Sequence, residues 1–519
     1  MAKRPNVLVI ISDDTDPFNL GCYGGDEFLT PHLDAFAAQG MRFTRAEVVA
    51  PVCTPSRYVY MTGQFPGRCP NHFRETNPVD QPYNITWNTD LAPGQANLAT
   101  IFRDNGYRTG YAGKFHCGRH SPQVGLEQLP KGHDPHDPAN DAIHRRNQAK
   151  MVAELQSYGW EEPRHVTEGN LDFNPWLDLP HNLEWTTQGA LDFLDGQKDH
   201  ERPFLLYVSY HAIHGPKHGE NLDQLDPLVT PGGLLDEPVS AGHPSRTSVL
   251  RRLKDAGLDP YHRNVGALWL DDGVGSILGR LKQLGLDDDT IVIYKADHGK
   301  YSKASVYQGG ARVPMIWRWP GQVVAGTACR AIVQNTDFLP TLIDVLGLDA
   351  PADYHFDGTS YAAQLRGSTA PLREDHYNEF GTTRSVRTER WKYIAFRYLP
   401  ETLAKLKAGE LDRLPSHLNR PGLSAEALHH RCYFDADQLY DLQQDRYEQI
   451  NVAHEPAYAD ILAEMRGRLQ RYLDTFEHPF PREADPFQLT DDYQRLARAA
   501  TADTSSVTQP GSVYGERFW

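Results

Sequence analysis

The chain has 519 residues, and its formal net charge of -16 comes with no basic stretch to offset it. This length supports a large core and about two domains. The acidic balance excludes a nucleic-acid binder, because phosphate contacts need clustered Lys and Arg, and an anionic substrate would need a local positive pocket.

Nothing in the sequence predicts a membrane-spanning segment. The N-terminal apolar run, Val7 to Ile11, is too short for a signal-peptide core, and no later run approaches the ~18 to 20 residues of a membrane helix. We therefore expect no membrane partner and a cytoplasmic location for the sequence as given. A periplasmic or secreted location is the alternative if a leader has been removed. The six cysteines lack metal-type pairs and do not indicate a disulfide scaffold.

Strand and helix patterns alternate through about the first 350 residues. The expected strands are 7–11, 108–112, 204–210 and 290–294, and the expected helices are 31–40, 98–106 and 268–285. The run Val7 to Ile11 is continuous and apolar, which is typical of a strand buried on both faces. This alternation predicts an α/β fold with a large, mostly parallel central sheet flanked by helices.

Two stretches interrupt this pattern, at about 117–180 and 215–260. The first is polar and rich in His, Pro, Asp and Trp, and we interpret it as a long loop or insertion. Its histidines, such as His133 and His136, are candidates for a second metal site, but the composition favours solvated loop residues. We expect both insertions to wall the substrate pocket.

Beyond about residue 375 the pattern changes to short strands and a helix near 458–476. That helix carries Leu462, Met465, Leu469 and Leu473 on one stripe. We predict three regions: 1–375, an α/β domain with both insertions; 376–480, a smaller α+β domain with a short antiparallel sheet; and 481–519, a polar tail. A homo-oligomer formed through this tail stays open.

Polar residues follow the predicted strands at the points where they end. These residues are Asp13 and Asp14, Lys114 and His116, His211 and His214, and Asp297 and His298. The carboxyl ends of parallel strands meet at one edge of a sheet, where ligands bind. The carboxylates suit a hard cation such as Ca²⁺ or Mg²⁺, and His298 would also suit Mn²⁺ or Zn²⁺. Lys114 and Lys303 supply positive charge for an anionic substrate. Taken singly, each of these residues is better explained as an ordinary loop or surface residue, and it is their occurrence at four strand ends that favours a site.

The stretch Cys53-Thr54-Pro55-Ser56-Arg57 predicts the start of a helix. Thr54 suits the cap and Pro55 the first helical position, and Gly63 suits the end. Cys53 then lies just before the positive end of the helix dipole, which lowers a thiol pKa and attracts an anion. On spacing alone, a helix that simply begins after a buried cysteine explains the pattern equally well.

Together these motifs resemble the formylglycine-dependent type I sulfatases of the alkaline phosphatase-like superfamily. Cys53 to Arg57 with Thr62-Gly63 resembles the family signature. Further similar blocks are Pro5 to Asp14, Thr30 to Asp34, Gly110 to His116, Gln308 to Pro314, Asn335 to Asp337 with Pro340-Thr341, Ser385 to Thr388 with Trp391 to Tyr393, and Leu439 to Leu442. The resemblance spans about residues 5 to 475 apart from the insertions.

The resemblance implies roles for individual residues. Asp13, Asp14, Asp297 and His298, with the modified Cys53, would bind one divalent metal, Ca²⁺ in most relatives, with Mg²⁺ or Mn²⁺ as alternatives. Arg57 would hold the formylglycine, and Lys114, His214 and Lys303 would bind the sulfate oxygens. Maturation would need a formylglycine-generating enzyme as partner. Gln308 and Ile213 depart from the more common Glu and Pro, which are not catalytic groups in relatives.

The mechanism that this resemblance implies begins with the hydrated aldehyde of residue 53. One hydroxyl attacks sulfur, and His214 or Lys303 protonates the leaving alcohol. His116 then helps to remove the proton of the second hydroxyl, so that the aldehyde reforms and sulfate leaves.

Two other functions remain open on the sequence. One is a phosphonate monoester or phosphodiester hydrolase of the same superfamily. The other is a non-catalytic anion or glycan binder in which Cys53 stays a thiol. For a sulfatase, we expect a sulfated carbohydrate rather than a small-molecule alkyl or aryl sulfate. Trp160, Trp176 and Trp185 are candidates for stacking on a sugar, with core packing as the alternative.

Overall fold

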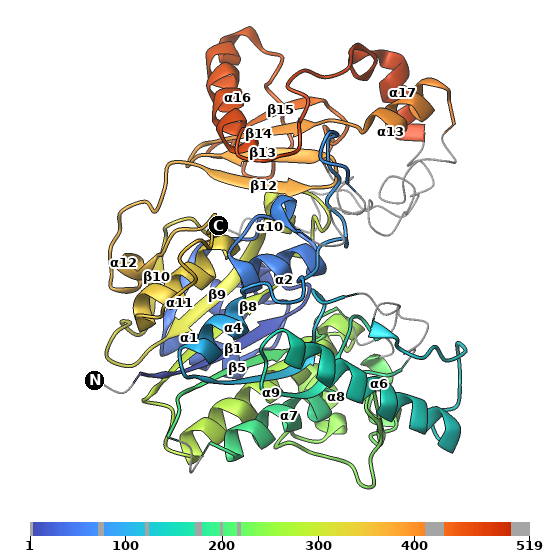
Figure 1. The fold of residues 1–519 in the computed structure, drawn as a ribbon, viewed down its shortest axis with the longest axis vertical. Helices are drawn as coiled ribbons and strands as arrows, with labels where there is room; N and C mark the ends of the chain where they lie inside the picture. Colours follow the sequence, from blue (N-terminus) through green and yellow to red (C-terminus); the bar gives the residue numbers. More distant parts are fainter. Residues whose placement is uncertain are drawn as a thin grey trace.

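The computed structural model describes residues 4–70, 77–119, 124–171, 179–197, 201–214, 219–410 and 430–499. Within these ranges, nine strands form one sheet in the order β10-β2-β9-β8-β1-β5-β3-β4, with β11 paired to β2 (Figure 1). The strands are β1 Asn6–Ser12, β2 Met41–Glu47, β3 Arg108–Lys114, β4 Glu162–Thr167, β5 Phe204–Ser209, β8 Thr290–Ala296, β9 Arg312–Arg318, β10 Thr327–Cys329 and β11 Val333–Gln334. Within the described part of this sheet, only the pairings of β9 with β8 and with β2 are antiparallel. The predicted α/β class with a mostly parallel sheet is confirmed.

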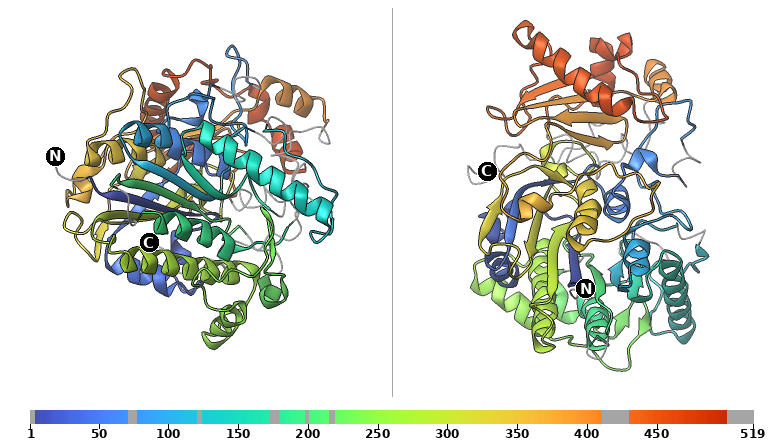
Figure 2. Two further views of the ribbon diagram at one scale, coloured as in Figure 1. Left: turned by 60° about the horizontal axis from the view of Figure 1, so that its bottom comes forward. Right: turned by 60° about the vertical axis from the view of Figure 1, so that its left-hand side comes forward.

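Helices cover both faces of this sheet (Figure 2). In β1, Val7, Val9 and Ile11 face one core, whereas Leu8 and Ile10 face the other. Burial on both faces is the reason for the continuous apolar run in this strand. The first core includes residues of α2 Cys53–Thr62, α4 Leu98–Asp104, α6 Pro138–Ser157 and α11 Phe338–Leu346; the second includes residues of α1 Pro31–Ala38, α7 Leu183–Asp195, α8 Arg246–Asp255 and α9 His262–Gln283.

The first insertion is more ordered than the sequence predicts. It contains the 20-residue helix α6 and the strand β4, which extends the sheet beside β3. The interpretation as a long loop is wrong here because the buried side of α6 includes His144, Asn147 and Glu154, so the helix has little apolar periodicity. The second insertion contains α8 and the short hairpin β6 Val229–Thr230 with β7 Gly233–Leu234.

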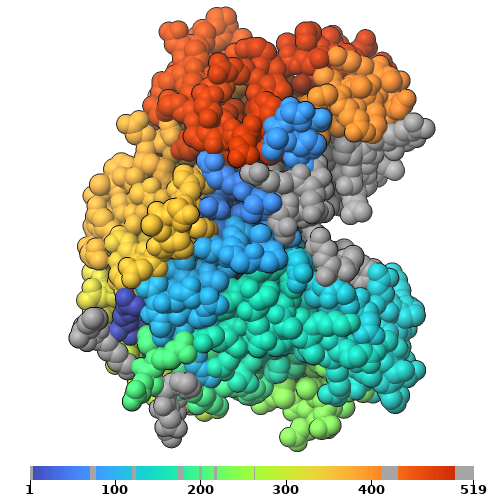
Figure 3. Space-filling view, viewed as in Figure 1, coloured from blue at the N-terminus to red at the C-terminus, as the bar shows by residue number. Residues whose placement is uncertain are grey.

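A second, four-stranded antiparallel sheet lies at one end of the molecule (Figure 1). The orange and red atoms of the C-terminal region occupy this end in the space-filling view (Figure 3). The sheet contains β12 His376–Phe380, β13 Thr383–Arg387, β14 Trp391–Phe396 and β15 Asp437–Asp441. The helix α16 Ala459–Leu473 packs on it through Met465, Leu469 and Leu473, as predicted, while Leu462 is only partly buried. The predicted boundaries at 375 and 480 stay predictions.

Part of the predicted tail is folded onto this C-terminal region. Helix α17 Asp491–Ala499 follows a short 3-10 turn, and Tyr493 is buried in a cluster with Tyr398 and Phe434. Residues 500–519 lie outside the described ranges.

The remaining short helices are α10 Gln308–Ala311, α12 Ala362–Leu365 and α13 Pro400–Lys407, with 3-10 turns η1 Pro17–Asn19, η2 Gly21–Tyr23, η3 Pro66–Arg68, η4 Gly219–Gln224, η5 Asn335–Asp337, η8 Pro456–Tyr458 and η9 Pro486–Leu489. Among the described residues, no helix has both the length and the apolar composition needed to cross a bilayer.

Candidate active site

The polar residues at the strand ends come together at one edge of the sheet. Strands β8, β1, β5 and β3 are parallel neighbours in that order. Asp13 and Asp14 follow β1, Asp297 and His298 follow β8, His214 follows β5, and Lys114 ends β3. Parallel pairing therefore places these segments, which are distant in sequence, around one point.

Cys53 reaches this point from the first position of α2. The helix begins at Cys53 rather than after Thr54, because the N–H of Ser56 already bonds to the carbonyl of Val52 at 3.1 Å. The predicted Thr54 cap is therefore wrong, and the buried Thr54 hydroxyl finds no hydrogen-bond partner among the described residues. Pro55 is tolerated because the first turn of a helix needs no N–H donors. Gly63 ends the helix as predicted, with φ +68° and a 2.8 Å bond to Val59.

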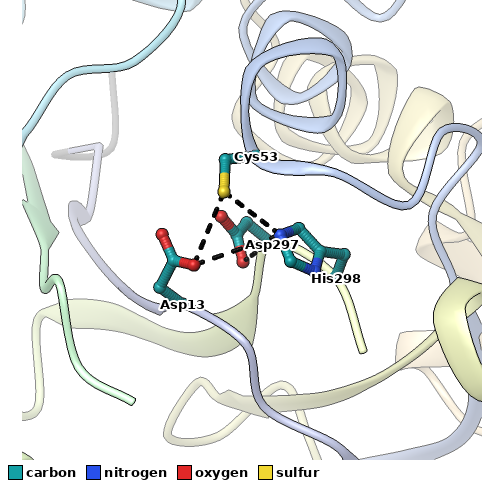
Figure 4. A group of neighbouring side chains, drawn as sticks. All are labelled: Asp13, Cys53, Asp297 and His298. Carbon is teal, nitrogen blue, oxygen red and sulfur yellow. Dashed lines mark hydrogen bonds and ion pairs between the residues drawn. The ribbon is translucent and has the colours of Figure 1, made fainter. Parts of the chain in front are cut away.

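Three buried side chains, those of Asp13, Asp297 and His298, converge on Cys53 (Figure 4). Its Sγ lies 3.2 Å from Nε2 of His298 and 3.6 Å from Oδ1 of Asp13. Nε2 of His298 lies 3.7 Å from Oδ1 of Asp297, and the four potential ligand atoms all lie within 4.8 Å of one another. Asp14 belongs to an adjoining group with Asp13 and His214.

The pKa values of this group indicate closely spaced carboxylates. Burial and the neighbouring Asp13 raise the pKa of Asp297 to about 7. Burial lowers the pKa of His298, but Asp297 and Cys53 raise it to a net value of about 9. The group offers carboxylate oxygens, an imidazole and a sulfur as ligands. A divalent cation fits this donor set, because its positive charge would offset the repulsion between the carboxylates of Asp13 and Asp297. The residues present therefore fit the metal that the sulfatase resemblance implies.

Three buried cations compensate the carboxylates. Arg57 donates to Oδ2 of Asp297 at 3.1 Å and to Oδ2 of Asp13 at 3.0 Å. Nζ of Lys114 lies 2.5 Å from Oδ2 of Asp13, and Nζ of Lys303 lies 2.7 Å from Oδ1 of Asp14. Within the described residues Arg57 makes no hydrogen bond to Cys53; its guanidinium joins the two carboxylates, and also Ser209 at 2.6 Å.

These cations also act on the thiol. Burial and Asp13 raise the pKa of Cys53, but Lys114, Lys303 and His298 lower it to a net value of about 7. The site is therefore positive enough around Cys53 to stabilise an anion, although the protein is acidic overall.

The structure adds one polar residue that the sequence analysis missed. Nζ of Lys114 donates to Oδ1 of Asn170 at 2.5 Å, and Nδ2 of Asn170 lies 3.3 Å from Nε2 of His214. Asn170 follows β4 by three residues. The sequence signal would have been another strand end, but β4 lies in the stretch interpreted as a loop. His211, which follows β5, contacts the last residue of β4: its Nε2 lies 2.7 Å from Oγ1 of Thr167.

The two remaining predicted histidines are neutral at pH 7. Burial, with Lys303 nearby, lowers the pKa of His214 to about 3. Burial and the charges of Lys114 and Arg57 hold the pKa of His116 well below its usual value. His116 is buried against Gly169, and its Nδ1 has no hydrogen-bond partner in the part of the chain that the structure describes. Among the predicted site residues it alone makes no hydrogen bond or ion pair to another within the described ranges.

Two of the tryptophans proposed for sugar stacking belong to the core. Trp160 is fully buried and packs edge-on against Tyr111, and Trp185 stacks on His165 with 4% of its surface exposed. The stacking hypothesis is therefore wrong for these two residues. Trp176 lies outside the described residues.

The site combines a buried donor set that fits a cation with Lys114 and Lys303 beside it, at the carboxyl edge of an α/β sheet, which is an arrangement suited to hydrolysis of anionic esters. The Sulfatase family model matches residues 5–348, and a model described as N-sulphoglucosamine sulphohydrolase, C-terminal, matches residues 296–412. The chain belongs to the sulfatase family, and it is a sulfuric ester hydrolase.

Relatives and solved structures agree with this assignment. An ulvan-active sulfatase from Formosa agariphila is 24% identical over 482 residues, covering 89% of this chain and 78% of the relative. A structure from work on the metabolism of multiple glycosaminoglycans by Bacteroides thetaiotaomicron has a TM-score of 0.62 and 21% identity, covering 91% of this chain and 99% of the other. A phosphonate monoester hydrolase of Agrobacterium radiobacter has a TM-score of 0.58 and 20% identity, covering 90% and 95%.

Proposed function

We propose that the chain releases sulfate from a sulfated carbohydrate, using a formylglycine made from Cys53 by a formylglycine-generating enzyme. The observation that carries the proposal is the arrangement around Cys53, where three cations and His214 surround one buried donor set. A carbohydrate substrate is supported by the names of relatives, which mention ulvan and glycosaminoglycans.

Two groups complete the site when they are present. The aldehyde of formylglycine, once hydrated, supplies a nucleophile that can later expel sulfate. The metal, for which we propose Ca²⁺ held by Asp13, Asp14, Asp297 and His298, supplies positive charge beside residue 53. Arg57 would keep the carboxylates of Asp13 and Asp297 apart and in place.

The side chains of the protein then bind the ester and move its protons. Lys114 and His214 would bind sulfate oxygens, with Asn170 between them to fix both. Lys303 would protonate the leaving alcohol, because Asp14 keeps its pKa raised and its ammonium charged, whereas His214 is neutral. Neutral His116 would accept the proton of the second hydroxyl.

A phosphorus ester is the second candidate substrate, because the phosphonate monoester hydrolase shares the fold at a similar TM-score. The test measures kcat/KM of the mature enzyme on an aryl sulfate, a phosphonate monoester and a phosphodiester, and then on a panel of sulfated saccharides. We expect the sulfate ester to be preferred, with at least one saccharide desulfated. A strong preference for either phosphorus ester would refute the sulfate proposal. Activity on a small alkyl sulfate with none on the saccharides would refute the carbohydrate proposal.

A separate experiment tests the fate of Cys53. After co-expression with a formylglycine-generating enzyme, mass spectrometry of the peptide that carries Cys53 should show the lower mass produced when CHO replaces CH₂SH. Cys53→Ala should fold and lose turnover, and Cys69→Ala, at another buried cysteine, is the matched control. An unmodified thiol together with no turnover would favour the non-catalytic binder.

A further inference from the structure

The loop that follows β8 carries Lys303 and is tightly folded on itself. The N–H of Gly299 bonds to the carbonyl of Gly310 at 2.9 Å and closes the base of the loop. A Cβ atom on Gly310 would lie 2.3 Å from the carbonyl oxygen of Ser302, so this close approach needs glycine. The position of the Lys303 ammonium therefore depends on how the whole loop is held.

A buried ion pair of the C-terminal region contacts this loop at Val306 and Gln308, shortly after Lys303. Lys392, on β14, donates from Nζ to the carbonyl oxygen of Val306 at 2.5 Å. Glu448 accepts a hydrogen bond from the N–H of Gln308 at 2.7 Å. The two side chains pair at 2.8 Å, and both are fully buried.

A second group of contacts joins the C-terminal region to the same loop. The ring of His430 stacks on Tyr307, with centroids 3.5 Å apart and planes within 5°. Nε2 of His430 lies 2.9 Å from Oγ of Ser302, the residue before Lys303. The hydroxyl of Tyr307 donates to Gln438 of β15 at 2.6 Å. The C-terminal region thus holds the loop on both sides of Lys303.

A buried ion pair by itself contributes little to the stability of a protein. Taking both charges out of water costs more than apolar residues of the same size would, so Lys392 and Glu448 need another reason to occupy the core. Each partner bonds to a backbone group of a buried residue in the loop, and buried backbone groups need hydrogen-bond partners. The pair therefore fixes the backbone at Val306 and Gln308 in one conformation.

We propose that Lys392 and Glu448 are positioning residues for Lys303, so that the C-terminal region completes the sulfatase site. The inference rests on the proposed role of Lys303, which transfers its proton to the alcohol oxygen as the S–O bond breaks. The ion pair acts through the loop and touches neither substrate nor metal.

The test compares the wild type with Lys392→Met/Glu448→Gln on aryl sulfates whose leaving phenols differ in pKa. We expect kcat to fall about 10- to 100-fold for the poorest leaving groups, because small misplacements of a catalytic group have effects of this size. The best leaving groups need little protonation and should lose less, so the dependence of kcat on leaving-group pKa should steepen. KM should change much less than kcat.

The matched control is Arg397→Met/Asp437→Asn. It removes another buried ion pair of the C-terminal region, with a distance of 2.8 Å. The hydrogen bonds described for Arg397 do not involve residues 299–311. The control variant should lower the melting temperature without changing the leaving-group dependence. If Lys392→Met/Glu448→Gln does not fold, Tyr307→Phe is the second variant. It removes the hydroxyl that bonds to Gln438 and interacts with Tyr440, keeps the ring that stacks on His430, and should show a smaller effect in the same direction.

Binding of inorganic sulfate, measured by calorimetry, provides a readout without turnover. The sulfatase resemblance also places the Lys303 ammonium on a sulfate oxygen, so binding should weaken in the Lys392→Met/Glu448→Gln variant, where this charge is displaced, and stay unchanged in the control. A wild type that hydrolyses no sulfate ester would refute the proposed function, while this binding difference would still support positioning of Lys303. An active wild type, with unchanged leaving-group dependence and sulfate binding in the variant, would overturn the inference.

Discussion

The ammonium group of Lys114 donates a hydrogen bond to the side-chain oxygen of Asn170 at 2.5 Å. Because a lysine only donates, this contact orients the amide so that Nδ2 faces Nε2 of His214 at 3.3 Å. His214 therefore accepts at Nε2 in this arrangement. One neutral side chain thus fixes two of the groups proposed to bind sulfate.

Asn170→Ala should reduce kcat/KM on an aryl sulfate by about 30- to 150-fold, the equivalent of ~2 to 3 kcal/mol for hydrogen bonds that include a charged donor. Steady-state kinetics measure this loss, and the melting temperature checks that the fold is kept. Asn140→Ala, which removes an exposed hydrogen bond to the carbonyl of Asp134, is the control and should leave kcat/KM unchanged. Wild-type kinetics in Asn170→Ala would show that Lys114 and His214 hold their places without it.

Removal of the metal should lower both activity and thermal stability. Neighbouring negative groups raise the pKa values of Asp297 and His298, and a bound cation would offset this negative charge. A ligand at 100 times its Kd stabilises the native state by about 2.7 kcal/mol. Thermal unfolding with EDTA, followed by addition of Ca²⁺, Mg²⁺ or Mn²⁺, measures the effect, and Ca²⁺ should restore most. Asp297→Asn should respond less to Ca²⁺. No response of the wild type to EDTA, together with no metal by elemental analysis, would contradict the metal proposal.

The pair His133 and His144 should make the fold sensitive to acid. Their Nε2 atoms lie 2.8 Å apart, and burial together with His133 lowers the pKa of His144 from 6.5 to about 4. The unfolded chain therefore takes up a proton at higher pH than the native state, so the contribution to stability is present above pH 6.5 and is lost as the pH falls towards 4. Melting temperatures between pH 7 and pH 4 measure this loss.

In His144→Gln the melting temperature should fall less steeply over this range. His454→Gln, at an exposed histidine, should retain the wild-type slope. Equal slopes in the wild type and in His144→Gln would contradict the assignment.

Two helix caps should differ in their effect on stability but not on catalysis. Asn97, fully buried, accepts from the N–H of Ala99 at 2.8 Å and donates to the carbonyl of Tyr158 at 3.0 Å. Asn97→Ala should lower the free energy of unfolding by ~2 to 3 kcal/mol, because it loses a cap and leaves buried groups unpaired.

The exposed cap Ser245 accepts from the N–H of Ser248 at 3.3 Å, and Ser245→Ala should cost ~0.5 to 1 kcal/mol. Urea unfolding gives both values, and kcat per folded enzyme should stay constant. A larger effect at Ser245 than at Asn97 would reverse the expected order.

Elements with strong apolar patterns were predictable from the sequence. The run Val7 to Ile11 specified a strand buried on both faces, and the stripe of α16 specified its packed side. Helix α6 was not predictable, because polar residues such as His144 and Glu154 occupy its buried side and pair through side chains. Its neighbour β4 was lost with it, and so was Asn170.

The sequence by itself determined most of the candidate site. Asp13, Lys114, His214 and Asp297 each follow a strand, and parallel pairing brings strand ends to one edge whatever the order of the strands. Only the tertiary structure decided that Arg57 joins Asp13 to Asp297, that Asn170 joins Lys114 to His214, and that Lys392 and Glu448 hold the loop of Lys303. These contacts join residues far apart in the chain, so no local propensity or periodicity encodes them, and packing alone brings the partners together.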